Sequence, residues 1–200
     1  VLTEYIPKDE RVVVIEDSAE LQIPGIENIV RLECKNANVQ GKGEVNVRQL
    51  IKASLRMRPN RIIVGEVRGG EVLDMIQAMN TGHDGSLSTG HGNSPEGMLS
   101  RLEAMFLQAA DFPIDAIRSQ IAEAIDIIVH LGRLSDKSRK VLEIAEIEGY
   151  QDGKIRVNPI FKYIINRSGA PNGDTPEGGL VSTGNQLKNT MKLEMNGVCI

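Results

Sequence analysis

Two stretches decide the fold: Arg11–Asp17 (RVVVIED) and Arg61–Val67 (RIIVGEV). Each contains a short, continuous run of β-branched apolar residues that is followed closely by an acidic side chain. Runs of this length and composition are typical of strands that are buried on both faces of a parallel sheet. The two stretches are therefore predicted to form neighbouring strands of such a sheet.

Helical periodicity is present in the segments between and after these strands. Asn46 and Gln49 approximate a capping box, and Ser94 followed by Pro95 is a typical helix start. The alternation of strands and helices predicts an α/β fold with a mostly parallel sheet and helices on both faces. Apolar residues repeat with helical spacing over residues 47–55, 72–79, 99–109 and 114–125.

The last third of the chain has a different pattern. Gln151–Lys154 (QDGK) is a predicted hairpin turn, so this part is expected to be antiparallel. Residues 166–185 are rich in Gly, Pro, Asn and Ser and are predicted to be a loop or linker, with one small element at 188–198. We expect one domain over residues 1–165 and a loop-rich tail over 166–200. Strands are predicted at Ile127–Leu131, Val141–Ile147 and Ile160–Ile165.

The composition excludes several classes of protein. The 200 residues carry 23 basic and 27 acidic side chains, a net charge of −4, which argues against a dedicated nucleic-acid binder. Cys34 and Cys199 are far apart and form no CxxC pair, so neither a disulfide framework nor a zinc site is expected. We therefore expect a reducing, cytosolic setting. Val1 reads as part of an element already under way, so we expect the sequence to be a fragment.

Carboxylates stand where the two decisive strands should end. Glu16 and Asp17 follow the first strand, and Glu66 follows the second. Ligands of open α/β sheets bind beyond the carboxyl ends of the strands. A carboxylate in that position can hold Mg²⁺ or orient an attacking water. The alternative is that these side chains only supply solubilising charge at strand ends.

Two histidines flank a polar, strand-capable run. His83 and His91 lie on either side of Asp84–Gly90 (DGSLSTG). A histidine at the end of such a strand can hydrogen-bond a phosphate or a catalytic carboxylate. The alternatives are two structural histidines or zinc ligands, and the spacing suits no common zinc signature.

Basic residues cluster ahead of and just after the Glu66 strand. Arginine is suited to bidentate phosphate contacts and can act across a subunit boundary. Most of these side chains are expected to be solvated surface, whereas Arg56, Arg58 and Arg68 flank the strand and are the candidates for phosphate contacts. The cluster consists of Arg48, Lys52, Arg56, Arg58, Arg61 and Arg68.

One motif of nucleotide-binding proteins does not occur in the sequence. The phosphate-binding pattern GxxxxGK[ST] is found nowhere, and Gly41-Lys42-Gly43 lacks the Ser or Thr that should follow the lysine.

Three stretches together resemble one protein family. Val12–Leu21 (VVVIEDSAEL) resembles the Asp box of bacterial secretion ATPases, and Leu55–Glu71 (LRMRPNRIIVGEVRGGE) resembles their atypical Walker B motif. Thr81–Pro95 (TGHDGSLSTGHGNSP) resembles their His box. The order and spacing also agree, and the resemblance extends from about Pro7 to the end of the chain. The nearest subgroup is the CpaF-like ATPases of Tad/Flp pilus assembly, with conjugal-transfer ATPases nearby, on the phrases AMNTGHDGS, SRLEAMFL, IRSQIAEAIDIIVHLGRL and STGNQL.

The resemblance implies a RecA-like P-loop fold and a ring of six subunits that bind ATP and Mg²⁺ at their interfaces. It implies a motor that assembles pili, or moves protein or DNA across the envelope. Such a motor would lie peripherally at the cytoplasmic face of the inner membrane, with inner-membrane platform proteins as partners and no direct nucleic-acid binding. Residues 1–165 would then be the part of the ATPase domain that follows the phosphate-binding loop.

The resemblance also implies roles for individual residues. Glu16 would polarise the attacking water, Glu66 would act near Mg²⁺ and that water, and His91 would couple the γ-phosphate to subunit motion. Which carboxylate is the general base stays open. Other side chains and one glycine would lie near the nucleotide: Asp17, Glu20, Arg56, Arg58, Gly65, Arg68, His83 and Thr89.

Two departures from the family pattern affect these implications. The pattern of the phosphate-binding loop is missing from these 200 residues, and in the family this loop should lie shortly before Val1. Gly92 stands where Ala is commoner. Glycines on both sides of His91 are expected to loosen the backbone there. Two other functions remain open: a ring motor that acts on nucleic acid, and an interaction module that keeps the fold without catalysis.

Overall fold

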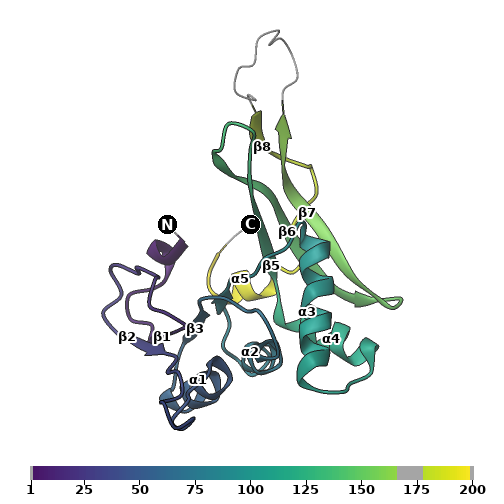
Figure 1. The fold of residues 1–200 in the computed structure, drawn as a ribbon. Coiled ribbons are helices and arrows are strands. Elements are labelled where there is room, and N and C mark those ends of the chain that lie inside the picture. The colour runs from purple at the N-terminus through teal and green to yellow at the C-terminus, as the bar shows by residue number, and fades with distance from the viewer. Residues whose placement is uncertain (1, 166–177, 199–200) are drawn as a thin grey trace.

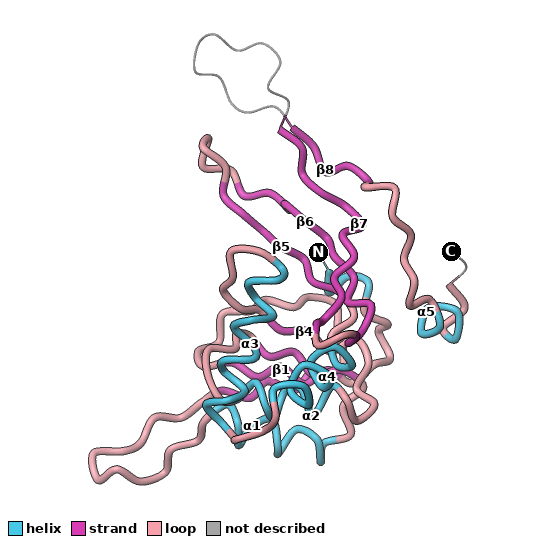
Figure 2. Tube along the Cα trace, turned by 90° about the vertical axis from the view of Figure 1, so that its right-hand side faces the viewer, coloured by secondary structure: helices cyan, strands magenta, loops and turns pink. Residues whose placement is uncertain are grey.

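The computed structural model describes residues 2–165 and 178–198 (Figure 1). A parallel sheet with helices forms the first two-thirds of the chain, and a long antiparallel sheet projects from it (Figures 1 and 2). The helices are η1 (Leu2–Tyr5), α1 (Val47–Ser54), η2 (Leu55–Met57), α2 (Glu71–Met79), α3 (Pro95–Ala109), α4 (Ile114–Ala124) and α5 (Met191–Met195). The strands are β1 (Val12–Glu16), β2 (Ile29–Glu33), β3 (Arg61–Val64), β4 (Leu87–Ser88), β5 (Ile127–Arg133), β6 (Arg139–Gln151), β7 (Lys154–Ile165) and β8 (Gly178–Ser182).

The parallel sheet has the strand order β2-β1-β3-β4. The two decisive stretches form β1 and β3, which pair directly in parallel, with Val12 opposite Arg61 and Ile15 opposite Val64. All five residues of β1 are buried. This confirms the prediction that the two stretches are neighbouring strands. The β2 strand (IVRLE) was not predicted, because it lies at the edge of the sheet and its charged, half-buried residues form no continuous apolar run.

The α-helices of this part cover one face of the parallel sheet. Side chains of α1, α2, α3 and α4 form one hydrophobic cluster with Val13, Ile15 and Val64. The opposite face is covered by Ile6, just after η1, and by loop residues such as Ile23. The sequence predicted helices on both faces of the sheet. In the described part of the chain, α-helices cover one face only.

The capping residues in the sequence correctly predicted where α1 and α3 begin. The Asn46 side chain accepts a hydrogen bond from the Gln49 amide, and Gln49 returns one to the Asn46 amide, which completes the capping box of α1. The Ser94 side chain accepts from the Gly97 amide at the start of α3. These caps satisfy amide groups that have no partner within the helix.

The antiparallel sheet has the order β5-β6-β7-β8. The predicted hairpin turn joins β6 to β7, and Asp152 and Gly153 both have positive φ, as a two-residue hairpin loop requires. The loop prediction is wrong for Gly178–Ser182, which pairs with β7 as β8. The glycines of this segment are typical of a loop, but pairing with β7 stabilises it as a strand. Residues 166–177 lie outside the described part, and the division of the chain at residue 165 stays a prediction.

A buried glutamate fixes the segment that follows β8. Glu146 on β6 is only 1% exposed, and its carboxylate accepts hydrogen bonds from the Lys188 and Asn189 amides and from the Asn158 side chain. The small element expected at 188–198 is α5, whose Lys192 lies 2.9 Å from Asp126. The buried charge is thus stabilised by several donors, as a buried carboxylate must be.

Replacing Glu146 by Ala should lower the free energy of unfolding by about 2 kcal/mol, because it leaves buried donors without an acceptor. Chemical denaturation measures this change. Glu148→Ala is the matched control, because Glu148 forms a single pair with the exposed Lys188 ammonium at 2.7 Å and should cost no more than about 1 kcal/mol. Equal losses in the two variants would contradict the role of Glu146.

Candidate functional site

Three segments meet at the carboxyl edge of the parallel sheet. Glu16 ends β1, Glu66 follows β3, and His91 follows β4. Because these strands run parallel, their carboxyl ends lie at the same edge. Residues that are far apart in the sequence are thereby brought into one site.

Gly65 allows the ends of β1 and β3 to approach each other. Its amide donates a hydrogen bond to the Ile15 carbonyl at 2.8 Å. A β-carbon at this position would lie 3.1 Å from Cγ of Glu16, closer than side chains usually pack. The glycine before Glu66, which distinguishes this motif, therefore makes room for the Glu16 side chain.

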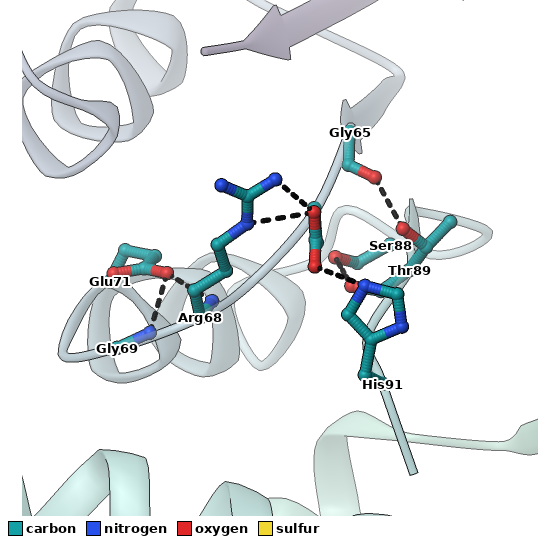
Figure 3. Close-up of polar contacts among 8 residues, drawn as sticks. Gly65, Arg68, Gly69, Glu71, Ser88, Thr89 and His91 are labelled. Carbon is teal, nitrogen blue, oxygen red and sulfur yellow. Dashed lines mark hydrogen bonds and ion pairs between the residues drawn. The ribbon is translucent and has the colours of Figure 1, made fainter.

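Glu66 is the centre of the site. Its Oε2 accepts hydrogen bonds from Nε and Nη2 of Arg68 at 2.8 and 2.6 Å. Its Oε1 lies 3.0 Å from Nε2 of His91. Arg68 and His91, both labelled in Figure 3, therefore contact different oxygens of this carboxylate. The Glu66 side chain is 21% exposed, whereas those of Arg68 and His91 are mostly exposed.

These contacts change the acidity of the carboxylate. The hydrogen bonds from Arg68 lower the pKa of Glu66, and partial burial opposes them. The charges of Arg68, His91 and Arg101 lower this pKa further. The same pairing raises the pKa of Arg68. Glu66 is therefore held as a carboxylate, which can accept a proton or approach a cation but cannot donate a proton.

Thr89 connects the end of β4 to the end of β3. Its hydroxyl donates to the Gly65 carbonyl at 2.5 Å (Figure 3). Its own carbonyl accepts from the Val67 amide at 3.0 Å. These two bonds flank Glu66 and fix the chain two residues before His91. The position of His91 beside Glu66 follows from this pairing.

The glycines around His91 have a packing role. A β-carbon on Gly90 would lie 2.4 Å from the Met98 Cε atom, and one on Gly92 would lie 3.0 Å from the Met98 Cβ atom. Neither glycine is among those with positive φ. Gly92 therefore lets the chain pass close to the first turn of α3, which differs from the loosening that the sequence suggested.

The Glu16 carboxylate is used by its own loop. Its Oε1 accepts hydrogen bonds from the Glu20 and Leu21 amides at 2.9 and 2.8 Å, and its Oε2 lies 3.8 Å from Arg31. Glu16 is buried. It thus holds the loop after β1 in place, while Asp17 and Glu20 in that loop are exposed.

A pocket of about 640 Å³ opens along this edge of the sheet. Burial and the neighbouring Asp17 raise the pKa of the Cys34 thiol in its wall, so this cysteine is not an activated thiolate. Acidic side chains outnumber basic ones in the lining. The acids are Glu16, Asp17, Glu20, Glu44, Glu66 and Glu71, and the bases are Lys35, Arg48 and Arg68.

Three of the predicted site residues lie elsewhere. Arg56 and Arg58 precede β3, so they lie toward its amino end, opposite Glu66. His83 precedes β4 and is likewise at the amino edge, where its Nδ1 lies 3.0 Å from the Ala78 carbonyl at the end of α2. Because these strands are short, the spacing in the sequence could not show at which end of a strand each of these residues lies.

Sequence reasoning missed two contributors to this region. The Glu71 side chain accepts hydrogen bonds from the backbone amides of Arg68 and Gly69. Its position at the start of a predicted helix was the signal in the sequence that could have identified this residue. Arg48 lines the pocket but is hydrogen-bonded to the buried Asp74 at 2.5 Å. Lys52 lies 3.3 Å from the same carboxylate, so both bases join α1 to α2.

Acidic, basic and histidine side chains thus gather beyond the carboxyl edge of an open parallel sheet, which is where α/β proteins of this type bind their ligands. The chain belongs to the type II/IV secretion system protein family, whose model matches residues 1–170. The fold is that of the RecA-like ATPases of this family.

Individual relatives agree with this assignment. The chain is 46% identical over 157 residues to a putative conjugal transfer protein of Mycobacterium tuberculosis, covering 78% of this chain and 44% of that protein. It is 40% identical to the conjugal transfer protein TrbB of Rhizobium radiobacter, covering 72% and 41%. The crystal structure of the VirB11 ATPase of the Brucella suis type IV secretion system, in complex with sulphate, superposes with a TM-score of 0.64 at 33% identity, covering 72% and 42%. The chain thus spans less than half the length of these relatives.

Among the described residues, no helix combines the length and apolar character needed to cross a membrane. The same residues contain no group of three or more His, Cys, Asp or Glu side chains arranged to hold a metal ion.

Replacing Arg68 by Ala should raise the pKa of Glu66, because it removes the hydrogen bonds that lower it most. A carboxyl ¹³C NMR titration of the chain measures the shift. In the wild type the Glu66–Arg68 pair stabilises the fold above the ordinary glutamate pKa, and this contribution is lost as the pH falls through the lowered pKa.

Arg31→Ala is the matched control for this titration, because Arg31 faces Glu16 at the same sheet edge. The control should leave the Glu66 midpoint unchanged. A Glu66 midpoint that does not move in Arg68→Ala would show that the two side chains are not paired in solution.

Proposed function

We propose that this chain is part of an ATP-hydrolysing motor subunit that powers pilus assembly, secretion or conjugal transfer across the bacterial envelope. The observation that carries the proposal is the Glu66 carboxylate, held between Arg68 and His91 at the carboxyl edge of a parallel sheet. The likeness of this chain to the VirB11 ATPase of Brucella suis supports the same chemistry.

The residues divide the work of hydrolysis. Glu66 is ionised and can orient the attacking water or contact hydrated Mg²⁺. Mg²⁺ would neutralise charge on the transferred phosphoryl group, and such an ion is commonly bound through the substrate phosphates together with one or two carboxylates. The carboxylates of Glu66, Asp17 and Glu20 offer the oxygen donors that this ion prefers.

His91 and Arg68 would sense the nucleotide. Both side chains are mostly exposed and contact different oxygens of Glu66, so a phosphate placed between them would compete for these contacts. Movement of His91 would pull on the segment that Thr89 ties to β3. Glu16 accepts hydrogen bonds from amides of the loop after β1, so it would act by holding this loop rather than on water directly.

The charge of the pocket indicates that further basic groups are needed. Its carboxylates outnumber its basic side chains, which would repel the polyanionic triphosphate. Mg²⁺ and a phosphate-binding loop would supply the missing positive charge, and the pattern of such a loop does not occur in these 200 residues. ATP and Mg²⁺ are the proposed ligands of the longer protein.

The family and its relatives guide the wider context. We place the motor in the CpaF-like branch, as a homohexamer at the cytoplasmic face of the inner membrane, with inner-membrane platform proteins as partners and no direct nucleic-acid contact. Support comes from the conjugal transfer proteins among the relatives. In such a ring Arg56 and Arg58, which lie at the opposite sheet edge from Glu66, could serve only a neighbouring subunit's site.

The decisive assay compares ATP hydrolysis by a longer protein, extended upstream to include the phosphate-binding loop, with the same protein carrying Glu66→Gln. The variant should lose about a hundredfold or more in kcat, because the amide cannot accept a proton. Glu27→Gln is the control, since Glu27 is an exposed side chain outside the pocket. A folded, hexameric protein that is as inactive as the variant would favour a non-catalytic interaction module.

The 200-residue chain alone should bind ATP weakly and turn over little of it, because its pocket is acidic and lacks a phosphate-binding loop. Isothermal titration with Mg²⁺-ATP measures this directly. Tight, stoichiometric binding to this chain would overturn the prediction.

A further inference from the structure

Glu71 makes two hydrogen bonds that hold the loop between β3 and α2. Its Oε1 accepts the backbone amide of Arg68 at 2.5 Å and that of Gly69 at 2.8 Å (Figure 3). Glu71 is the first residue of α2. One side-chain oxygen therefore fixes two successive residues of the loop that carries Arg68.

Besides Glu71, the loop is held by hydrogen bonds from the Val72 and Leu73 amides to the Gly69 and Gly70 carbonyls. Gly70 occupies the N-cap of α2 and makes no side-chain capping bond. Two successive glycines, Gly69 and Gly70, would allow the backbone many conformations. Glu71 accepts hydrogen bonds from the amides of the two residues before this N-cap, and not from the first turn of α2. Gly70 also packs closely on Ala109, since a β-carbon there would lie 3.1 Å from the Ala109 Cβ atom.

The direction of the Arg68 side chain depends on this loop. The side chain is 71% exposed, so packing contributes little to its position. Its Nε and Nη2 reach back two residues to Oε2 of Glu66. A backbone that is already fixed at Arg68 lowers the conformational entropy lost when the guanidinium presents both nitrogens to one oxygen.

We propose that Glu71 is a positioning residue: by fixing the backbone at Arg68 and Gly69, it aims the Arg68 guanidinium at Glu66 and so keeps the Glu66 carboxylate in place and ionised. Its importance for hydrolysis rests on the function proposed above. The contact itself does not, because it is formed by hydrogen bonds between residues of this chain.

The sign of an electrostatic change separates this role from a simple charge effect. Removing the Glu71 carboxylate takes a negative charge away from the pocket, which by itself would lower the pKa of Glu66. Loss of the Arg68 hydrogen bonds would raise that pKa. Positioning and direct electrostatics therefore predict opposite shifts.

The test is a carboxyl ¹³C titration of Glu66 in the 200-residue chain without nucleotide. Glu71→Ala should move the midpoint upward, toward that of Arg68→Ala. Glu71→Gln keeps an oxygen at the same reach and should leave the midpoint at or slightly below that of the wild type. Glu71→Asp keeps the charge but shortens the side chain, so it should move the midpoint upward and stays informative if Glu71→Ala does not fold.

Asn46→Ala is the matched structural control, because it removes the cap of α1 and leaves the Glu66 loop untouched. It should lower thermal stability without moving the Glu66 midpoint. Midpoints at or below the wild-type value in both Glu71→Ala and Glu71→Asp would overturn the proposal and leave Glu71 as a support of the loop backbone only.

The two proposals can fail separately. In the longer, active protein, Glu71→Ala should shift the acid limb of the pH profile of kcat/KM upward, and Glu71→Gln should restore it. An upward titration shift in the chain, combined with no hydrolysis in the longer protein, would keep the positioning role and reject the ATPase.

Discussion

The Glu66 carboxylate, shared between Arg68 and His91, is the interaction on which the site depends. It joins the end of β3 to the segment after β4, and Thr89 reinforces the same junction through the Gly65 carbonyl. None of these contacts would form without the parallel register of β1, β3 and β4, which places the strand ends at one edge. Backbone topology therefore creates the site, and a few polar side chains fix its geometry.

Much of this arrangement could be predicted from the sequence. The β-branched runs of β1 and β3 identified buried parallel strands, and the acidic residues after them located the site. The caps at Asn46 and Ser94 placed two helices, and QDGK placed a hairpin. These features are local, so their physical causes lie within a few residues of each other in the chain.

Other features depend on contacts between distant segments. The β2 and β8 strands exist because a neighbour pairs with them, and their own residues give a weak signal. His83 and His91 look equivalent in the sequence, but a two-residue strand separates them and places only His91 beside Glu66. Likewise, the hydrogen bonds that turn Glu16 toward its own loop are invisible without coordinates.

We propose that a nucleoside triphosphate binds with its terminal phosphate beside Glu66 and His91. A crystal structure of the longer protein with Mg²⁺ and a non-hydrolysable ATP analogue tests it most directly. We expect the γ-phosphate to lie at the carboxyl edge of the parallel sheet, within hydrogen-bonding reach of His91 or Arg68. A nucleotide bound elsewhere, with Glu66 still paired to both side chains, would contradict it.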